Sequence, residues 1–394
     1  MNTKEMIAFV DLHAQHASIL DEIHAAINEI LSNSSFIGGA AVSQFEDEFA
    51  QYLGVQEVIG VGNGTDALWL ALVANGIGPG DAVITVPNTF IATAEGITRA
   101  GAHPLFVDID IETANLSSVA LNEFLANQCN VDDNGHLRHV QTGTRVAAVM
   151  PVHLYGLPAD LLAISEICEQ HQLTLIEDAC QAHGAKIRVS GEWKRAGTFG
   201  AAAAFSFYPG KNLGAIGDAG AVVTNNPEAA AKIRELRSHG SSEKYIHTTH
   251  EGWNARLDAI QAAVLSIKLR YLDEWNECRY QAAQWYRQGL AGLPIELPYE
   301  PEGHQHVYHL YVVRTEQRDE VRKALLDYGI ETGIHYPIPL HLQQAYNWMN
   351  LPLGSFPNAE RSAQTILSLP MHPYLSQQQV EHVCQAFKSV LSDK

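Results

Sequence analysis

Between residues 58 and 177, short apolar runs alternate with stretches of helical periodicity, and glycine or proline turns separate them. The runs are short enough for strands, and several are apolar at every position, as in strands buried on both faces. The expected strands are 58–61, 82–86, 104–108, 146–152 and 173–177, with helices at 65–75, 90–100 and 161–171. This order predicts an α/β fold in which helices cover both faces of a mainly parallel sheet.

The two ends of the chain show helical periodicity without this alternation. Expected helices are 12–32, 42–53, 256–270, 276–290, 318–328 and 377–392, and expected strands are 201–207, 221–224 and 307–314. A chain of 394 residues is long enough for two domains, so we predict a large domain at 1–270 and a smaller C-terminal α+β domain at 271–394. The polar segment 127–144 is expected to form a surface hairpin.

Composition argues against several classes of protein. No apolar run approaches the length that crosses a bilayer, and residues 1–7 lack the pattern of a secretory leader. The five cysteines are odd in number and show no C-x-x-C spacing, which favours a reducing cytoplasm. The net charge is −19 and basic residues are not clustered, so we expect no nucleic acid partner. The histidines at 304, 306 and 309 lack a nearby acid or thiol at ligand spacing, so no metal is predicted.

Asp178 and Lys211 each follow an expected buried strand. Ligands of open α/β sheets bind at the carboxyl ends of strands, so both side chains are expected in one site. A lysine in apolar surroundings has a disfavoured ammonium form, which suits Schiff-base chemistry, and a carboxylate can keep a pyridine nitrogen protonated. Taken singly, Asp178 also fits a helix N-cap and Lys211 a solvated lysine. The pair favours the catalytic interpretation of both residues.

The turn Gly-Asn-Gly-Thr at 62–65 joins an expected strand to an expected helix. Free backbone amides at a helix N-terminus form an anion site. The glycines also have a simpler explanation, because turns between a strand and a helix often need glycine for their backbone conformation alone. Gly64, Thr65 and Asp66 are therefore candidate phosphate ligands, with Asp66 acting through its amide rather than its carboxylate. Ser206 could add a hydroxyl to the same phosphate.

An amine, a ring-nitrogen partner and a phosphate site are what pyridoxal 5'-phosphate requires. Phe90 is a candidate to stack on the cofactor ring, and Gln181 a candidate to reach its phenolic oxygen. A core phenylalanine and a solvated glutamine are the alternatives. A nicotinamide dehydrogenase is disfavoured, because residues 60–64 lack the full G-x-G-x-x-G.

These motifs resemble those of the DegT/DnrJ/EryC1/StrS sugar aminotransferases, within the fold-type I pyridoxal phosphate enzymes. The resemblance covers nearly the whole chain and rests on segments 36–39, 62–68, 177–184, 206–220, 252–258 and 333–337. It implies a fold-type I aminotransferase with a mostly parallel seven-stranded sheet and a smaller C-terminal α+β domain. Two departures are Ala219, where the family pattern has glycine, and a longer segment 127–144.

The resemblance also implies roles for particular residues. Lys211 would carry the cofactor and move a proton, while Asp178 would make the ring an electron sink. Asn254 would bind the cofactor phosphate of the neighbouring subunit, which implies a homodimer with shared active sites. His335 and Tyr336 would line the pocket for a sugar nucleotide.

Residues 207–214 and Lys244–Tyr245 are most similar to enzymes that aminate C3 of a dTDP-linked 3-keto-6-deoxyhexose, with L-glutamate as donor by the same resemblance. The implied product is a dTDP-3-amino-3,6-dideoxyhexose for lipopolysaccharide or another glycan. A UDP-2-acetamido-3-keto sugar is the alternative acceptor. A non-catalytic cofactor-binding regulator is the alternative of a different class, and it is disfavoured because a sensor does not need both Lys211 and Asp178. Related 3-dehydratases carry histidine at the lysine position, so Lys211 argues against that activity.

Overall fold

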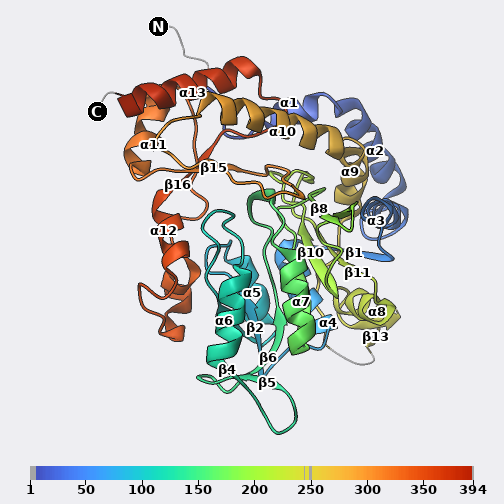
Figure 1. Ribbon diagram of the computed structural model, residues 1–394. Coiled ribbons are helices and arrows are strands. Elements are labelled where there is room, and N and C mark those ends of the chain that lie inside the picture. Colours follow the sequence, from blue (N-terminus) through green and yellow to red (C-terminus); the bar gives the residue numbers. More distant parts are fainter. Residues whose placement is uncertain (1–5, 244, 248–250, 393–394) are drawn as a thin grey trace.

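The computed structural model describes residues 6–243, 245–247 and 251–392, and its centre is a large sheet (Figure 1). Seven strands follow the order β1–β11–β10–β7–β6–β2–β3. They are β1 (Glu57–Val61), β2 (Asp81–Thr85), β3 (His103–Phe106), β6 (Arg145–Val149), β7 (Thr174–Asp178), β10 (Ala202–Ser206) and β11 (Gly220–Thr224). Every pair from β10 to β3 is parallel, while β11 is antiparallel to both of its neighbours. The predicted α/β class is confirmed.

Helices cover both faces of this sheet because its strands are apolar on both sides. Ala202 and Ala204 of β10 pack into a cluster with one set of helices, α4 (Gly64–Ala74), α5 (Ala92–Arg99) and α8 (Pro227–Leu236). Ala203 and Phe205 of the same strand pack into the opposite cluster. The helices of that second face are α3 (Ala40–Leu53) and α9 (Ala259–Leu269), and α6 (Ser118–Gln128) and α7 (Leu161–His171) cover its other half. The alternation follows from the two-residue period of a strand.

The helix expected at 12–32 is wrong as a single element. It is divided into α1 (Leu12–Ala17) and α2 (Leu20–Asn33). At the break, the Ser18 hydroxyl donates to the Gln15 carbonyl and also meets the Tyr374 hydroxyl. Serine side chains that bond nearby backbone compete with a continuous helix.

The segment expected to form a surface hairpin contains β4 (Cys129–Val131) and β5 (Leu137–His139), which pair antiparallel. β5 joins the main sheet through one register pair with β6, so the sheet has nine strands in all. The hairpin lies at the bottom of Figure 1, at the opposite end of the sheet from α10 (Leu272–Gly289). Further strands that the sequence did not indicate are β8 (Lys186–Val189), β9 (Glu192–Arg195), β12 (Ser241–Glu243), β13 (Ile246–His247) and β14 (His304–Gln305).

The C-terminal part of the chain has its own apolar cluster. The cluster contains Ile7 and residues between 282 and 387, and it surrounds a two-stranded sheet of β15 (Tyr311–Arg314) and β16 (Ile366–Leu369). The helices here are α10, α11 (Arg318–Asp327), α12 (Pro357–Thr365) and α13 (Gln377–Ser392). The segment between α11 and α12 contains two short 3-10 helices, η2 (Leu340–Leu342) and η3 (Gln344–Met349). A third, η1 (Leu154–Gly156), lies between β6 and α7 of the main sheet. A boundary near residue 270 stays a prediction. Within the described ranges, no helix is both long and apolar enough to cross a membrane.

Candidate active site

The carboxyl ends of β7 and β10 and the start of α4 meet at one edge of the sheet. β7 ends at Asp178 and β10 ends at Ser206, and the two strands run parallel in register. A Cβ atom placed on Gly64 would lie 2.6 Å from Ser206 Cβ and 3.2 Å from Cys180 Sγ. Residues from three distant parts of the sequence therefore surround one small space, where a glycine is required at position 64.

This space has the features of a phosphate site. The N–H groups of Gly64 and Thr65 open α4 and have no acceptor among the described residues, as is usual in a first helical turn. The Asp66 N–H already donates to the capping Asn63 Oδ1 at 2.8 Å. The Asp66 carboxylate accepts from Arg99 at 2.6 Å and from the Asn63 Nδ2 at 3.0 Å, so both of its oxygens are already engaged. Two free amides and the Ser206 hydroxyl remain for an anion.

Asp178 is 4% exposed, and hydrogen bonds hold its carboxylate at both oxygens. The Thr93 hydroxyl donates to one oxygen at 2.7 Å, and the Cys180 N–H donates to the other at 3.2 Å. Thr93 in turn meets the hydroxyl of Thr89 at 2.9 Å. A buried carboxylate with lone pairs to spare and a fixed orientation is suited to pair with a protonated ring nitrogen.

Lys211 lies in the turn after β10, where its N–H donates to the Tyr208 carbonyl at 2.8 Å. Burial lowers the pKa of the Lys211 amine, and the nearby Cys180 and Asp178 side chains partly oppose this shift. The two side chains predicted to act together are therefore within electrostatic reach of each other. A lowered pKa makes the free amine, which is the nucleophilic form, more abundant near neutral pH.

Gln181, Tyr336 and Phe90 form one group beside this pair. The Gln181 Oε1 accepts the Tyr155 N–H at 2.7 Å, and its Nε2 donates to the Tyr336 hydroxyl at 3.2 Å. The Phe90 ring lies 5.7 Å from the Tyr336 ring at 39° and is 52% exposed, so one of its faces is available. His335 bonds Ser368 through Nδ1 at 2.8 Å.

Asn254 differs from the other predicted residues because its backbone lies near the site while its side chain is exposed. It precedes Ala255, whose carbonyl accepts the Gly62 N–H at 3.0 Å, so its backbone lies close to the phosphate site. Its side chain is exposed and makes no hydrogen bond within the described ranges. Lys244, which was expected to indicate the substrate class, lies outside the described residues, while Tyr245 is exposed.

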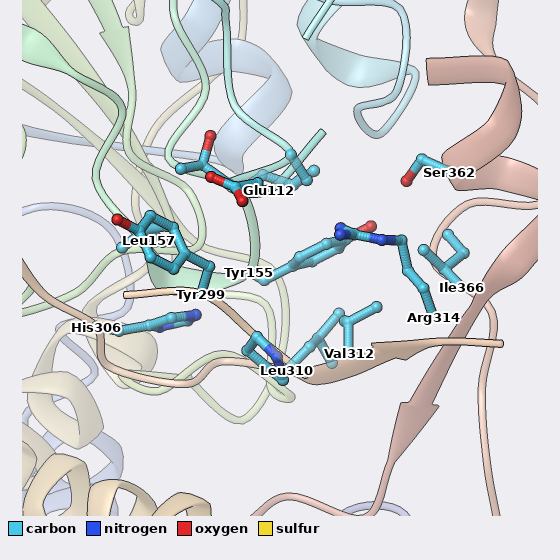
Figure 2. Close-up of a pocket in the computed structure, with 14 residues that line it drawn as sticks. Glu112, Tyr155, Leu157, Tyr299, His306, Leu310, Val312, Arg314, Ser362 and Ile366 are labelled. Atoms are coloured by element: carbon cyan, nitrogen blue, oxygen red, sulfur yellow. The ribbon is translucent and has the colours of Figure 1, made fainter. Parts of the chain in front are cut away.

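The sequence did not indicate Thr93 or Tyr155. Tyr155 bonds both Gln181, through its N–H, and the His335 carbonyl, through its hydroxyl. In Figure 2 its side chain points towards Arg314 across a cavity of about 30 Å³, which suits roughly one water molecule. This cavity is too small for a substrate, and the hydrogen bonds of Tyr155 connect it instead to Gln181 and His335.

A second groove and a metal cluster are the other kinds of functional site that such a fold can offer. A groove of about 700 Å³ between β3, α6 and η3 includes none of the predicted site residues. Within the described part of the chain, no group of three His, Cys, Asp or Glu side chains is arranged to hold a metal ion. The chemistry-bearing groups therefore gather around Lys211.

The site fits pyridoxal 5'-phosphate. One edge of the α/β sheet carries a glycine-lined anion site, a hydrogen-bonded buried carboxylate and an amine of lowered pKa. This combination defines a pyridoxal phosphate enzyme of the aminotransferase type. The chain belongs to the DegT/DnrJ/EryC1/StrS aminotransferase family, whose model matches residues 17–388.

Three relatives illustrate the similarity. A dTDP-3-amino-3,4,6-trideoxy-alpha-D-glucose transaminase of Streptomyces venezuelae is 43% identical over 97% of this chain and 95% of that protein. A UDP-N-acetyl-3-dehydro-alpha-D-glucosamine 3-aminotransferase of Acidithiobacillus ferrooxidans is 40% identical over 99% of this chain and 100% of that protein. The crystal structure of S. venezuelae DesV in complex with a ketimine intermediate has a TM-score of 0.90 and 43% identity, covering 98% of both chains.

These comparisons confirm the predicted family, fold type, aminotransferase class and cofactor. The named relatives are sugar-nucleotide aminotransferases, which confirms the predicted function at that level. The roles of the individual site residues stay predictions, and their arrangement in the structure is compatible with those roles.

Proposed function

We propose that the protein transfers an amino group from L-glutamate to the C3 keto group of a dTDP-linked 6-deoxyhexose, using pyridoxal 5'-phosphate. The observation that carries this proposal is the Lys211 amine of lowered pKa beside the hydrogen-bonded Asp178 carboxylate. The dTDP-sugar transaminase of S. venezuelae, at 43% identity, supports the choice of acceptor.

Each residue has a distinct role in the proposed mechanism. The cofactor, when bound, supplies a carbonyl that captures amines and a ring that delocalises the charge left by proton removal. Gly64, Thr65 and Ser206 hold its phosphate, and Asp178, oriented by Thr93, keeps its ring nitrogen protonated. The freed Lys211 amine removes the proton from the donor Cα and returns a proton during amination of the acceptor. Phe90 supports the ring by stacking, and Gln181 orients it through the phenolic oxygen.

The pocket for the acceptor is proposed to include His335 and Tyr336. The Gln181 Nε2 donates to the Tyr336 hydroxyl, and the Tyr155 hydroxyl donates to the His335 carbonyl, so both residues are hydrogen-bonded to the proposed cofactor site. Donor and acceptor then use the same Lys211 in succession, and the donor product leaves before the acceptor binds. Initial rates should therefore show ping-pong kinetics.

The active unit is proposed to be a homodimer in which Asn254 reaches the phosphate site of the other subunit. The exposed Asn254 side chain and its neighbour Trp253, which is 57% exposed, support this assignment. Mixing Lys211→Ala subunits with Asn254→Ala subunits tests it, because a hybrid dimer contains one site with both residues intact. We expect activity to recover on mixing at limiting cofactor. Recovery that never exceeds the sum of the two separate variants would exclude shared sites.

The proposed location is the cytoplasm, and the proposed use of the product is lipopolysaccharide or another glycan. All five cysteines are free thiols, which is typical of a reducing compartment.

A panel of nucleotide sugars read by mass spectrometry tests the proposed acceptor. The panel contains dTDP-3-keto-6-deoxy sugars of both 4-hydroxyl configurations, together with UDP-2-acetamido-3-keto-glucose. We expect the carbonyl-to-amine mass change for a dTDP sugar with L-glutamate as donor. Amination of the UDP sugar alone would favour the second acceptor class, which the A. ferrooxidans relative represents at 40% identity. Failure to consume any donor would favour the non-catalytic regulator.

A further inference from the structure

Phe9 lies far from His335 in the sequence, yet the rings of these two residues are in contact. The ring centroids are 5.5 Å apart and the ring planes differ by 14°, which is a stacked arrangement. Tyr336, the next residue, accepts a hydrogen bond from Gln181 at 3.2 Å, and its ring lies 5.7 Å from that of Phe90. A continuous series of contacts therefore connects Phe9 with the residues proposed to hold the cofactor ring.

Hydrogen bonds on both sides of Phe9 fix the place of its ring. The Phe9 N–H donates to the Glu331 carboxylate at 3.0 Å. The Phe9 carbonyl accepts from the Met371 N–H at 3.2 Å. The N-terminal segment is therefore attached to the same part of the chain as His335, so the Phe9 ring has a defined position relative to the imidazole.

Two further contacts restrict the His335 ring. Its Nδ1 lies 2.8 Å from the Ser368 hydroxyl, and Ser368 exchanges two backbone hydrogen bonds with Gly333. A Cβ atom placed on Gly333 would lie 2.5 Å from His335 Cε1, so a glycine is needed there for the ring to keep its place. Phe9 at one face, Ser368 at Nδ1 and Gly333 at Cε1 leave the imidazole little freedom to turn.

The Ser368 hydroxyl also determines which nitrogen of His335 carries a proton. Ser368 is 0% exposed, and its hydroxyl has no other partner within the described ranges. A buried hydroxyl that accepted from Nδ1 would leave its own proton unpaired, so the hydroxyl donates and Nδ1 accepts. Burial, with a smaller contribution from the charge of Lys211, lowers the pKa of His335 to about 4, so the neutral ring carries its single proton on Nε2. Among the residues that the structure describes, none accepts from this Nε2–H, which is available to a ligand.

We propose that Phe9 is a positioning residue for the acceptor: its ring holds the His335 imidazole in the orientation in which the Nε2–H donates to an oxygen of the keto sugar. This rests on the proposed function, in which His335 and Tyr336 line the acceptor pocket. The sugar rather than the diphosphate is the expected partner, because Tyr336 is hydrogen-bonded to Gln181, the residue proposed to contact the cofactor ring. A flat apolar ring fixes the imidazole plane without offering a competing hydrogen-bond partner.

Two variants disturb the imidazole from different sides. Phe9→Leu keeps an apolar side chain but removes the flat ring. Gly333→Ala adds a Cβ atom that displaces the imidazole and leaves Phe9 unchanged. Trp348→Leu is a matched control, since the Trp348 ring also contacts a histidine, His103, at 5.2 Å, but lines the groove that includes none of the predicted site residues.

The readout is the rate of each half-reaction of the holoenzyme, followed by the absorbance of the cofactor. The acceptor half-reaction starts from the aminated cofactor and a dTDP-linked 3-keto-6-deoxyhexose. Its kcat/KM should fall by about 2- to 13-fold in Phe9→Leu and in Gly333→Ala, the loss expected from one ring pair or one neutral hydrogen bond. The half-reaction with L-glutamate, which carries no sugar, should keep its wild-type rate, and Trp348→Leu should match the wild type in both.

A double-mutant cycle decides whether Phe9 acts through His335. Phe9→Leu should have no further effect on the acceptor half-reaction in protein that already carries His335→Ala. An equal loss in both backgrounds, or no loss in Phe9→Leu alone, would overturn the proposal. Inhibition by dTDP should be the same in the wild type and in Phe9→Leu, whereas weaker inhibition of the variant would place the contact on the diphosphate and refute the sugar assignment.

Histidine-selective ¹⁵N spectra of the wild-type holoenzyme provide a measurement that needs no variant to fold. They should show His335 protonated at Nε2, and a ring protonated at Nδ1 would refute the proposal. The wild-type half-reactions keep the two ideas apart. If the wild type reacts with neither L-glutamate nor the keto sugar, the proposed function fails, whereas wild-type reactions that Phe9→Leu leaves unchanged exclude only the role of Phe9.

Discussion

Replacing Gly64 by alanine tests the phosphate site. The added Cβ would lie 2.6 Å from Ser206 Cβ and 3.1 Å from Ser206 Oγ, whereas carbon atoms in contact prefer about 3.5–4.0 Å. An overlap of about 1 Å must be relieved by movement of Ser206 or of the start of α4, and overpacking of this kind costs about 1–3 kcal/mol. Either movement displaces a group that is proposed to hold the phosphate.

Bringing the displaced group back to hold the phosphate restores the overlap, so the cofactor dissociation constant should rise by about 5- to 150-fold. The assay is equilibrium binding of pyridoxal 5'-phosphate, followed by absorbance, with thermal unfolding of the cofactor-free protein measured in parallel. Gly78→Ala is the matched control, because its Cβ would meet only the Ala100 carbonyl at 3.5 Å. Wild-type affinity in Gly64→Ala would refute the assignment of this turn to the phosphate.

Three further predictions concern Lys211, Thr93 and His183. Lys211→Ala should fold with a melting temperature near that of the wild type, yet its turnover should fall by at least about 10²- to 10⁴-fold. Glutamate-dependent turnover at the wild-type rate would exclude Lys211 as the base. Thr93→Val removes the 2.7 Å hydrogen bond to Asp178 and leaves a buried carboxylate oxygen unpaired. Turnover should fall by about 10- to 100-fold, and the unfolding free energy measured by urea titration should fall by about 1–3 kcal/mol. His183 is fully buried, and burial is the main reason why its pKa is lowered to about 3. As the pH falls from about 6.5 towards 3, His183 is therefore protonated in the unfolded chain but still neutral in the folded protein. The unfolding free energy should therefore decrease over that range, and His183→Phe should reduce the slope by up to about 1.4 kcal/mol per pH unit; an unchanged slope in denaturant titrations would contradict this.

The strands of the sheet were predictable because they are buried on both faces. Val83 and Ile84 of β2 point to opposite helical layers, so the strand is apolar at successive positions and stands out from its polar turns. The hairpin of β8 and β9 was not indicated, since its residues are mostly polar and only Ile187 is deeply buried. Strands that pack on one side over a few residues leave a weak pattern.

The sequence indicates residues of the candidate site only where a local motif carries the chemistry. Asp178 and Lys211 follow strands, and Gly64 opens a helix, so their position along the chain suggested a common location. Thr93 and Tyr155 hold other site residues across 85 and 180 positions of sequence, and no local pattern encodes such contacts.

The position of the covalently held cofactor tests the central claim most directly. Borohydride reduction of the holoenzyme, followed by peptide mapping with mass spectrometry, identifies the lysine that carries the pyridoxyl group. The structure predicts a single modified residue, Lys211, and prior addition of L-glutamate should diminish the label. A pyridoxyl group on another lysine, or none on Lys211 in protein that is yellow and active, would contradict the account.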